Sequence, residues 1–231
     1  MAVYKLFPTQ DTTIYSQYPA KNTGLDSIIE VNTNVDAYLS RYLIQFSQNE
    51  INSLIDSKIG TASLQVNLKN YIANIENLNT STLLYVFPTS GSWEMGTGKF
   101  NDSPETDNGC SWVFKAYSGS SPWLTDNFNP YSTGSYEDVA GGGNWYTGSA
   151  LGLEIVQSQS YNYNSDKDLN VDVTNTVLTW YSQSKGETNN GFNNDGFIIK
   201  QSKNDEIGGL YKQAKIKFYS VDTNTIYPPR S

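Results

Sequence analysis

The chain has 231 residues, a length near the upper end for a single all-β domain. It contains no histidine, which removes the commonest general base and the most frequent transition-metal ligand. A single cysteine, Cys110, excludes an internal disulfide and a cysteine-built zinc site. The net charge is −8 and the basic residues are spread singly, which argues against nucleic acid as a partner because phosphate contacts need clustered positive charge.

Short strand-like runs between turn residues dominate the sequence. The first six are Tyr4 to Phe7, Thr12 to Tyr15, Ser27 to Val31, Tyr38 to Phe46, Ala62 to Leu68 and Leu84 to Phe87. The run from Ala62 to Leu68 alternates apolar and polar residues, which is typical of a half-buried strand. Four later runs also predict core strands: Leu151 to Val156, Leu169 to Val173, Phe197 to Lys200 and Lys215 to Ser220.

Two short helices interrupt the strands. The first follows Ser47, which has the spacing of a capping box with Glu50. The second runs from Thr174 to Ser182, with Thr174 as its expected N-cap. Both are too short for a helical bundle, so we expect them to close one end of a β-sandwich.

The stretch from about residue 91 to 148 has a different composition. Gly, Ser, Asn, Asp and Pro dominate it, and it carries four tryptophans. A structureless loop of this length is unusual in a compact domain, so we interpret it as an insertion with its own strand, Ser111 to Tyr117. We therefore predict one domain over 1–231, with this insertion and an extended C-terminal tail at about 221–231 that lies on the domain or on a neighbour.

The order of the elements predicts the fold class. Many short strands without βαβ alternation indicate an all-β, antiparallel sandwich. A jelly-roll-like arrangement is favoured because both ends of the chain are strand-like and are expected to pair. The N-terminus has no apolar signal core and no run reaches membrane-spanning length, so we expect a soluble protein that does not contact a membrane.

Several blocks of the sequence resemble the DNRLRE-type β-sandwich domain family. They are Asp11 to Ile14, Asn22 to Gly24, Ser40 to Phe46, Ala62 to Val66, Gly91 to Glu94, Val171 to Trp180, Asn190-Gly191 and Phe197 to Ile199. Members of that family are generally adhesive, carbohydrate-binding or cell-surface modules. The resemblance therefore implies a β-sandwich that acts by binding.

A narrower similarity lies at the two ends and in the insertion. The stretches YKLFPTQDTTIYSQYPAKNTGLD, GCSWVFKAYSGSSPW, GGGNWYTG and KIKFYSVDTNTIYPP are similar to tailed-phage virion proteins of this fold. This similarity implies a virion structural protein of the tail, neck, baseplate or capsid surface, made in the host cytoplasm. Its partners would be other virion proteins, in repeated copies or as a homo-oligomer. The alternative is a carbohydrate-binding module that attaches to a glycan of the host surface.

Aromatic and proline residues are the candidates for contact with a partner or a glycan. They are Trp112, Trp123, Trp145 and Tyr146 in the insertion and Tyr227, Pro228 and Pro229 in the tail. The insertion aromatics allow three interpretations: a small core that holds the insertion down, a subunit interface, or a platform that stacks on sugar rings.

Five residues are candidates for structural roles, namely Asp11, Arg41, Trp93, Asp172 and Trp180. Arg41 stands inside an apolar run and needs a carboxylate partner, for which Asp11 and Asp172 are the candidates. Trp180 belongs to the predicted second helix, where we expect it to pack in the core.

Acidic turns around Asp107 and Asp195 offer oxygen atoms that could hold Ca²⁺. Asn-Asp-Gly is also a common turn sequence, and no loop has the carboxylate spacing of an EF-hand. The sequence therefore predicts no cofactor, with calcium as the open alternative.

Catalysis finds little support. Glycoside hydrolysis needs only two carboxylates, and the available ones are Glu94, Glu105, Asp107, Glu137 and Asp138. Nothing in the sequence places two of them at a working separation, and no nucleophile or phosphate-binding motif is present. We predict a non-enzymatic protein that acts through its surface.

Overall fold

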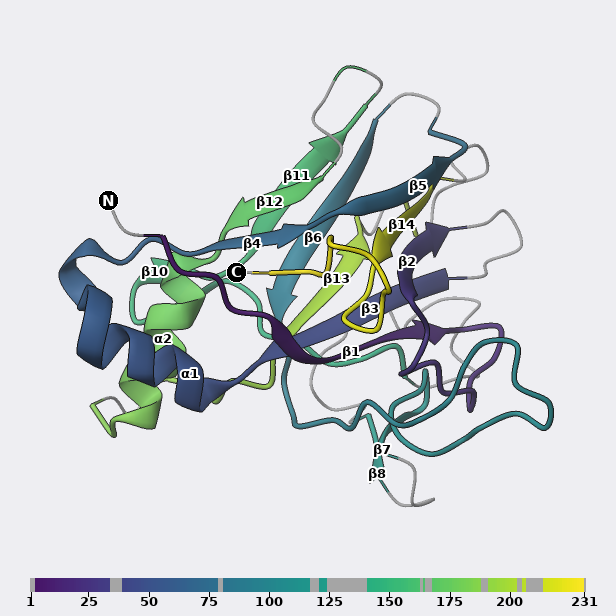
Figure 1. The fold of residues 1–231 in the computed structure, drawn as a ribbon, viewed down its shortest axis with the longest axis horizontal. Coiled ribbons are helices and arrows are strands. Elements are labelled where there is room, and N and C mark those ends of the chain that lie inside the picture. Colours follow the sequence, from purple (N-terminus) through teal and green to yellow (C-terminus); the bar gives the residue numbers. More distant parts are fainter. Residues whose placement is uncertain are drawn as a thin grey trace.

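A computed structural model describes residues 3–33, 39–78, 81–116, 121–123, 141–162, 164, 168–187, 191–202, 205–206 and 214–230. Within these residues the predicted all-β, antiparallel sandwich is confirmed. Figure 1 shows a curled sheet of long strands, with both helices together at one end of it. The loops of the insertion gather beside the first strand, away from the helices (Figure 1). Neither helix that the structure describes is long and apolar enough to cross a membrane.

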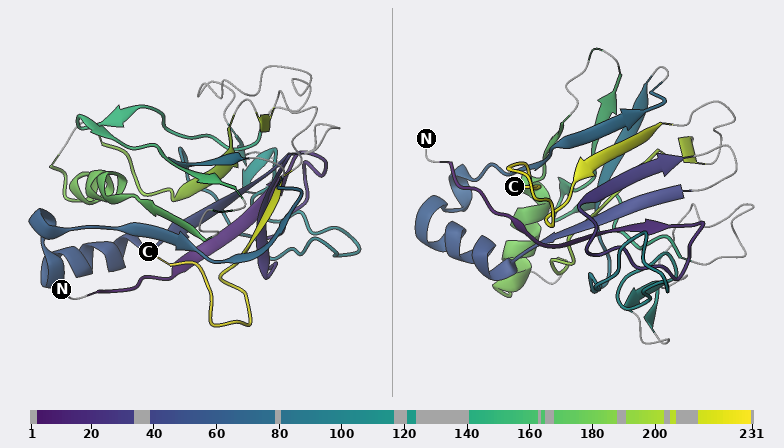
Figure 2. Two further views of the ribbon diagram at one scale, coloured as in Figure 1. Left: turned by 90° about the horizontal axis from the view of Figure 1, so that it is seen from above. Right: turned by 45° about the vertical axis from the view of Figure 1, so that its right-hand side comes forward.

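The main sheet has eight strands, and all its described pairings are antiparallel. Seven of them follow one another in the order β11 (Gln157–Tyr161), β6 (Thr82–Pro88), β13 (Phe197–Gln201), β3 (Leu39–Phe46), β2 (Ile28–Thr33), β14 (Lys215–Tyr219) and β5 (Ile72–Glu76). The eighth strand, β1 (Pro8–Tyr15), pairs with β3. Figure 2 shows the same sheet from two further directions.

Smaller elements complete the fold. Three two-stranded ladders join β4 (Asn67–Asn70) to β12 (Leu169–Asp172), β7 (Phe114–Ala116) to β8 (Ser121–Pro122), and β9 (Ser149–Ala150) to β10 (Leu153–Glu154). Helix α1 (Gln48–Leu54) continues as a π-helical turn (Ile55–Ile59) and is followed by a 3₁₀ turn (Thr61–Ser63), and α2 spans Thr174–Ser184. Strand β4 leads directly into β5, so the chain passes from the small sheet to the main sheet at Tyr71.

The central strands of the main sheet, β3 and β13, are buried on both faces. Successive side chains of a strand point to opposite faces, and in β3 Tyr42 and Ile44 enter one core whereas Leu43 enters another. The first core lies between the sheet and the layer formed by β4, β12 and the two helices. The second core lies between the opposite face and the insertion. Burial on both sides explains why β3 and β13 read as almost continuous apolar runs.

The helix ends follow from local chemistry only in part. Ser47 is confirmed as the N-cap of α1, because its side chain accepts a hydrogen bond from the backbone N–H of Glu50 at 3.3 Å. The expected cap of α2 is wrong. Val173 is the N-cap residue, and the hydroxyl of Thr174 instead accepts a hydrogen bond from the backbone N–H of Val66 at 2.8 Å. A tertiary contact therefore uses the side chain that the sequence assigned to the cap.

Several strand predictions need correction. The alternating run from Ala62 to Leu68 starts as a 3₁₀ turn, and its strand begins only at Asn67. Leu64 and Val66 do pack against the first core. The alternating pattern therefore reflects the burial of every second side chain and not a β-strand at these residues. The run from Tyr4 to Phe7 is not a strand, because β1 begins at Pro8. Tyr38 and Tyr117, at the ends of two other predicted strands, lie outside the described residues.

The pairing expected between the two ends of the chain is not found. Strand β1 pairs with β3, and β14 lies between β2 and β5. A side chain joins the ends instead, since a carboxyl oxygen of Asp11 accepts a hydrogen bond from the backbone N–H of Val221 at 2.7 Å.

Candidate functional site

The insertion tryptophans lie inside the molecule. Trp112, Trp123 and Trp145 are 4%, 2% and 6% exposed, and they pack with apolar side chains of β1, β3 and β13 in the second core. The indole N–H of Trp123 donates to the backbone oxygen of Ser111 at 3.0 Å. Tyr146 is half-buried and stacks on Phe192. In this arrangement the three tryptophans hold the insertion on the sheet and present almost no surface to a ligand.

Trp93 and Trp180 are also buried, as expected of structural residues. The indole N–H of Trp93 donates to the backbone oxygen of Asp195 at 2.8 Å, which ties the start of the insertion to the loop before β13. Trp180 packs against Phe197 with 4.8 Å between the ring centroids, which fixes α2 on the main sheet.

A buried ion cluster lies beneath the insertion, and it corrects the expected partner of Arg41. The guanidinium of Arg41 donates to both carboxylate oxygens of Glu206, at 3.1 and 3.0 Å, and the ammonium of Lys200 is 2.6 Å from the same carboxylate. The Arg41 and Glu206 side chains are each 1% exposed. Neither Asp11 nor Asp172 takes this role. Asp11 faces Val221, and the exposed Asp172 accepts a hydrogen bond from the backbone N–H of Thr174.

The electrostatics of the cluster favour its ionised form. Burial lowers the pKa of Lys200 to about 8, although the carboxylate of Glu206 opposes this shift. Burial alone would raise the pKa of Glu206, but the charges and hydrogen bonds of Arg41 and Lys200 outweigh it, so the pKa stays below its usual value. Burying these charges costs desolvation free energy, and the cluster is stable only while both cations pair with the carboxylate of Glu206.

The glycine run 141–143 makes this packing geometrically feasible. The backbone oxygen of Gly142 accepts a hydrogen bond from Arg41 at 2.5 Å. A Cβ atom at Gly142 would lie 2.5 Å from that guanidinium and 2.8 Å from the Trp112 ring, and the residue has a φ of +81°. Only glycine lets the backbone approach so closely.

The turns proposed for calcium hold no cluster of ligands. Asp107 is exposed, and one carboxylate oxygen of the half-buried Asp195 accepts a hydrogen bond from the backbone N–H of Gly91 at 2.9 Å. Among the described residues no three His, Cys, Asp or Glu side chains come together as a metal site. Glu137 and Asp138 lie outside the described residues.

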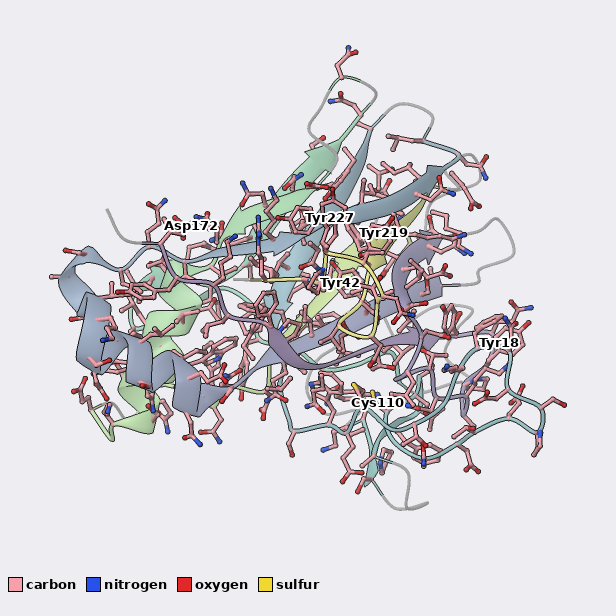
Figure 3. The ribbon with its side chains drawn as sticks, in the orientation of Figure 1. Tyr18, Tyr42, Cys110, Asp172, Tyr219 and Tyr227 are labelled. Atoms are coloured by element: carbon pink, nitrogen blue, oxygen red, sulfur yellow. The ribbon has the colours of Figure 1, made fainter. Side chains whose placement is uncertain are left out.

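Three tyrosines from distant parts of the chain form a surface cluster, here called the tyrosine platform: Tyr71, Tyr219 and Tyr227. The rings of Tyr219 and Tyr227 are nearly parallel, with 6.2 Å between their centroids, and the Tyr71 and Tyr227 centroids are 5.3 Å apart. Tyr227 is 46% exposed. Figure 3 labels Tyr219 and Tyr227 next to each other, over β14 and the C-terminal segment.

Backbone hydrogen bonds hold the platform in place. The N–H of Tyr219 donates to the backbone oxygen of Tyr71 at 3.0 Å. Lys69 and Arg230 exchange two backbone hydrogen bonds, of 2.7 and 2.9 Å, so the tail lies against β4. The bond from Val221 to Asp11 anchors the start of the loop that carries Tyr227. The exposed ring thus stands on a loop that is fixed at both ends. Pro228 is half-buried and Pro229 is buried beside it.

Two cations flank the platform. The ammonium of Lys69 lies 4.9 Å from the centroid of the Tyr71 ring, and the guanidinium carbon of Arg230 lies 4.8 Å from it. Lys69 also makes a long ion pair, 3.7 Å, with Asp168. Aromatic faces beside hydrogen-bond donors suit a ligand that has both apolar faces and oxygen acceptors.

Sequence reasoning identified Tyr227 but not the other members of this site. Tyr71 and Tyr219 are two of 17 tyrosines, and no motif distinguishes them. One local pattern could have identified Tyr219. Strand β14 alternates, and its half-buried face carries Lys215, Lys217 and Tyr219. Nothing local indicated that residue 230 would pair with residue 69.

The platform adjoins a cleft of about 500 Å³, because Lys69 and Arg230 also line that cleft. The cleft lies between the N-terminal segment, α1, β4 and α2, and most of its lining is apolar. A separate polar depression near β12 is lined by Gln65, Gln157, Asp172 and Asn175 and by no aromatic ring among the described residues. Of these three features, only the platform presents a cluster of aromatic rings beside charged donors, with Tyr227 as its exposed ring.

An antiparallel β-sandwich with an aromatic cluster beside cations at its surface is typical of a binding module. Residues 2–125 match the sequence model of carbohydrate-binding module family 96. The match covers more than half of the chain, and the protein belongs to this family. No curated protein matches the chain. The match supports the carbohydrate-binding alternative of the sequence analysis and carries no link to phage particles. It includes Lys69 and Tyr71, whereas Tyr219, Tyr227 and Arg230 lie beyond it.

Proposed function

We propose that the protein binds a polysaccharide at the tyrosine platform and that it acts by binding alone, without chemical turnover. The observation that carries this proposal is the exposed Tyr227 ring, stacked with Tyr219 and adjacent to Tyr71. The C–H groups of a sugar ring carry partial positive charge and pack well on the electron-rich face of an aromatic ring. Membership of a carbohydrate-binding module family supports the same class of ligand.

The flanking cations supply the polar half of the recognition. Lys69 and Arg230 stand over the Tyr71 ring, and both side chains donate hydrogen bonds without accepting any. Sugar hydroxyl, ring and carboxylate oxygens are acceptors for such donors. The guanidinium of Arg230 can engage two neighbouring oxygens at once, which would orient a sugar residue on the platform.

The substitution Tyr227→Ala tests this proposal. We expect the variant to fold normally, because Tyr227 is 46% exposed and lies outside both cores. It should bind polysaccharide at least about tenfold more weakly, which corresponds to about 1.4 kcal/mol. Tyr227→Phe should retain most of the affinity, since it keeps the aromatic face. Phe7→Ala is the matched control, because it removes another exposed aromatic ring outside the platform.

Affinity gel electrophoresis against a panel of neutral and acidic polysaccharides, followed by calorimetry on the best ligand, gives the readout. The proposal fails if the wild-type chain binds no member of the panel. It also fails if Tyr227→Ala and Phe7→Ala bind as tightly as the wild-type chain. Release of reducing ends during incubation would contradict binding without turnover.

We further propose that the module is carried on a tailed-phage particle and binds a host-surface glycan there. The support for this placement is the similarity of the two chain ends and of the insertion stretches to tailed-phage virion proteins. Mass spectrometry of purified particles tests it. The chain should be recovered at a fixed ratio to the major capsid protein, and its absence from intact particles would end the proposal.

A further inference from the structure

The cleft beside the tyrosine platform has a chemistry unlike that of a sugar site. Its floor includes the buried side chains of Trp180 and Phe197, and its walls include Ile51, Leu54, Val66 and Val177. A sugar ring placed there would lose the hydration of its hydroxyl groups with few partners in return. A hydrocarbon chain has no hydroxyl groups to desolvate, and its transfer from water to an apolar cleft is favourable in free energy.

The charged residues that line the cleft, among those that the structure describes, all have one sign. Lys5, Lys58, Lys69 and Arg230 line it, and among the described residues that line it there is no Asp or Glu. This is notable in a chain with 23 acidic and 15 basic residues. Lys5 and Lys58 form no ion pair within the part of the chain that the structure describes. The rim therefore favours an anionic group at the mouth of an apolar cleft.

We propose that this cleft binds a fatty-acid anion, with its acyl chain on the apolar walls and its carboxylate at the cationic rim. The volume of about 500 Å³ lies within the range of small-molecule sites, roughly 300–1,000 Å³. Part of the cleft lining comes from the N-terminal segment that precedes β1, which contributes Val3, Tyr4, Lys5 and Leu6. The proposal is independent of glycan binding, because the platform and the cleft share only their two boundary cations.

A chain-length series tests the acyl part of this proposal. Displacement of a dansyl-labelled undecanoate by octanoate, decanoate and dodecanoate, each below its micelle concentration, measures their affinities. Burial of hydrocarbon predicts that affinity rises by about fourfold per methylene. Dodecanol, which has the same chain without the charge, should bind more weakly than dodecanoate. An affinity that is independent of chain length, or dodecanol binding as tightly as dodecanoate, would overturn the proposal.

Two variants locate the site. Leu54→Trp puts a large ring into the cleft and should reduce dodecanoate affinity at least tenfold, whereas Leu151→Trp, on an exposed leucine elsewhere, should not. The double variant Lys5→Gln and Lys58→Gln changes two rim side chains without touching the core, and should weaken dodecanoate by about two- to fivefold. Unchanged dodecanoate affinity in Leu54→Trp or in the double lysine variant would refute the assignment.

Tyr227→Ala separates this inference from the proposed function. It should weaken polysaccharide binding and leave dodecanoate affinity unchanged, because Tyr227 does not line the cleft. Failure of the wild-type chain to bind dodecanoate refutes the fatty-acid site alone. Failure to bind any polysaccharide, with the chain-length series intact, refutes the platform alone.

Discussion

Removal of the carboxylate that Arg41 and Lys200 share should be strongly destabilising. Glu206→Gln keeps the size of the side chain but removes the carboxylate that pairs with both buried cations, Arg41 and Lys200. The buried Asp205 then supplies the remaining negative charge near Lys200. Breaking a buried ion pair by removing one partner typically costs about 3–5 kcal/mol. For a chain of this size that corresponds to a fall in Tm of about 6–20 °C.

Glu76→Gln is the matched control for this prediction. Glu76 pairs with Lys217 at 2.8 Å, but its side chain is 43% exposed, so its loss should cost no more than about 1 kcal/mol. Urea unfolding followed by tryptophan fluorescence measures both values. Adding Lys200→Met to Glu206→Gln removes one of the two cations that have lost this carboxylate and should restore part of the stability. If Glu206→Gln is as mild as Glu76→Gln, the three charges are not buried together and the account of the insertion core is wrong.

Three further predictions concern buried groups and the strand order. Burial raises the pKa of Asp11 to about 8. The folded chain therefore keeps a proton on Asp11 that the unfolded chain releases near pH 4. The stability that Asp11 contributes is present below about pH 4 and is lost as the pH rises towards 8, by up to about 1.4 kcal/mol per pH unit. The difference in unfolding free energy between the wild-type chain and Asp11→Asn, measured from pH 5 to 8, should show this slope, and a flat difference would contradict it. Cys110 is buried and its burial raises its pKa well above the usual value, so it should react with a thiol reagent only as fast as the chain unfolds, and rapid labelling of the native chain would contradict its placement. A chain shortened to residues 1–125 should show no cooperative unfolding transition by circular dichroism, because it lacks β13, whereas a sharp transition would mean that the matched segment folds alone.

The fold was predictable where burial leaves a local trace. Strands β3 and β13 lie between two cores, and their apolar runs identify them as buried strands in the sequence. Helix α1 was predictable because its N-cap is a local hydrogen bond between Ser47 and Glu50. Strand β11 was missed, since its sequence, Gln157–Tyr161, is mostly polar and it lies at the edge of the sheet. An edge strand with one solvated face needs few apolar residues.

The partner of Arg41 was not predictable from the same sequence. The apolar surroundings of Arg41 correctly showed that its charge must be compensated. They could not show by which residue, because Glu206 is 165 positions away in a polar stretch without a periodic pattern. The buried Lys200 in β13 was a second sign of the same kind, and two cations in neighbouring apolar strands indicate a shared carboxylate. Sequence thus shows that a buried charge needs a partner, and only the strand order shows which partner is within reach.

The candidate binding surface depends on the same long-range order. The segment that matches the carbohydrate-binding family supplies Lys69 and Tyr71 at the corner between β4 and β5. Strand β14, from the end of the chain, pairs with β5 and brings Tyr219 beside Tyr71, and the tail then returns to pair with β4 and adds Tyr227 and Arg230. The platform is therefore formed where the corner between β4 and β5, in the first third of the chain, meets the C-terminal segment. Because β14 also pairs with β2 and β5 in the main sheet, a strand that stabilises the sheet also assembles the binding surface.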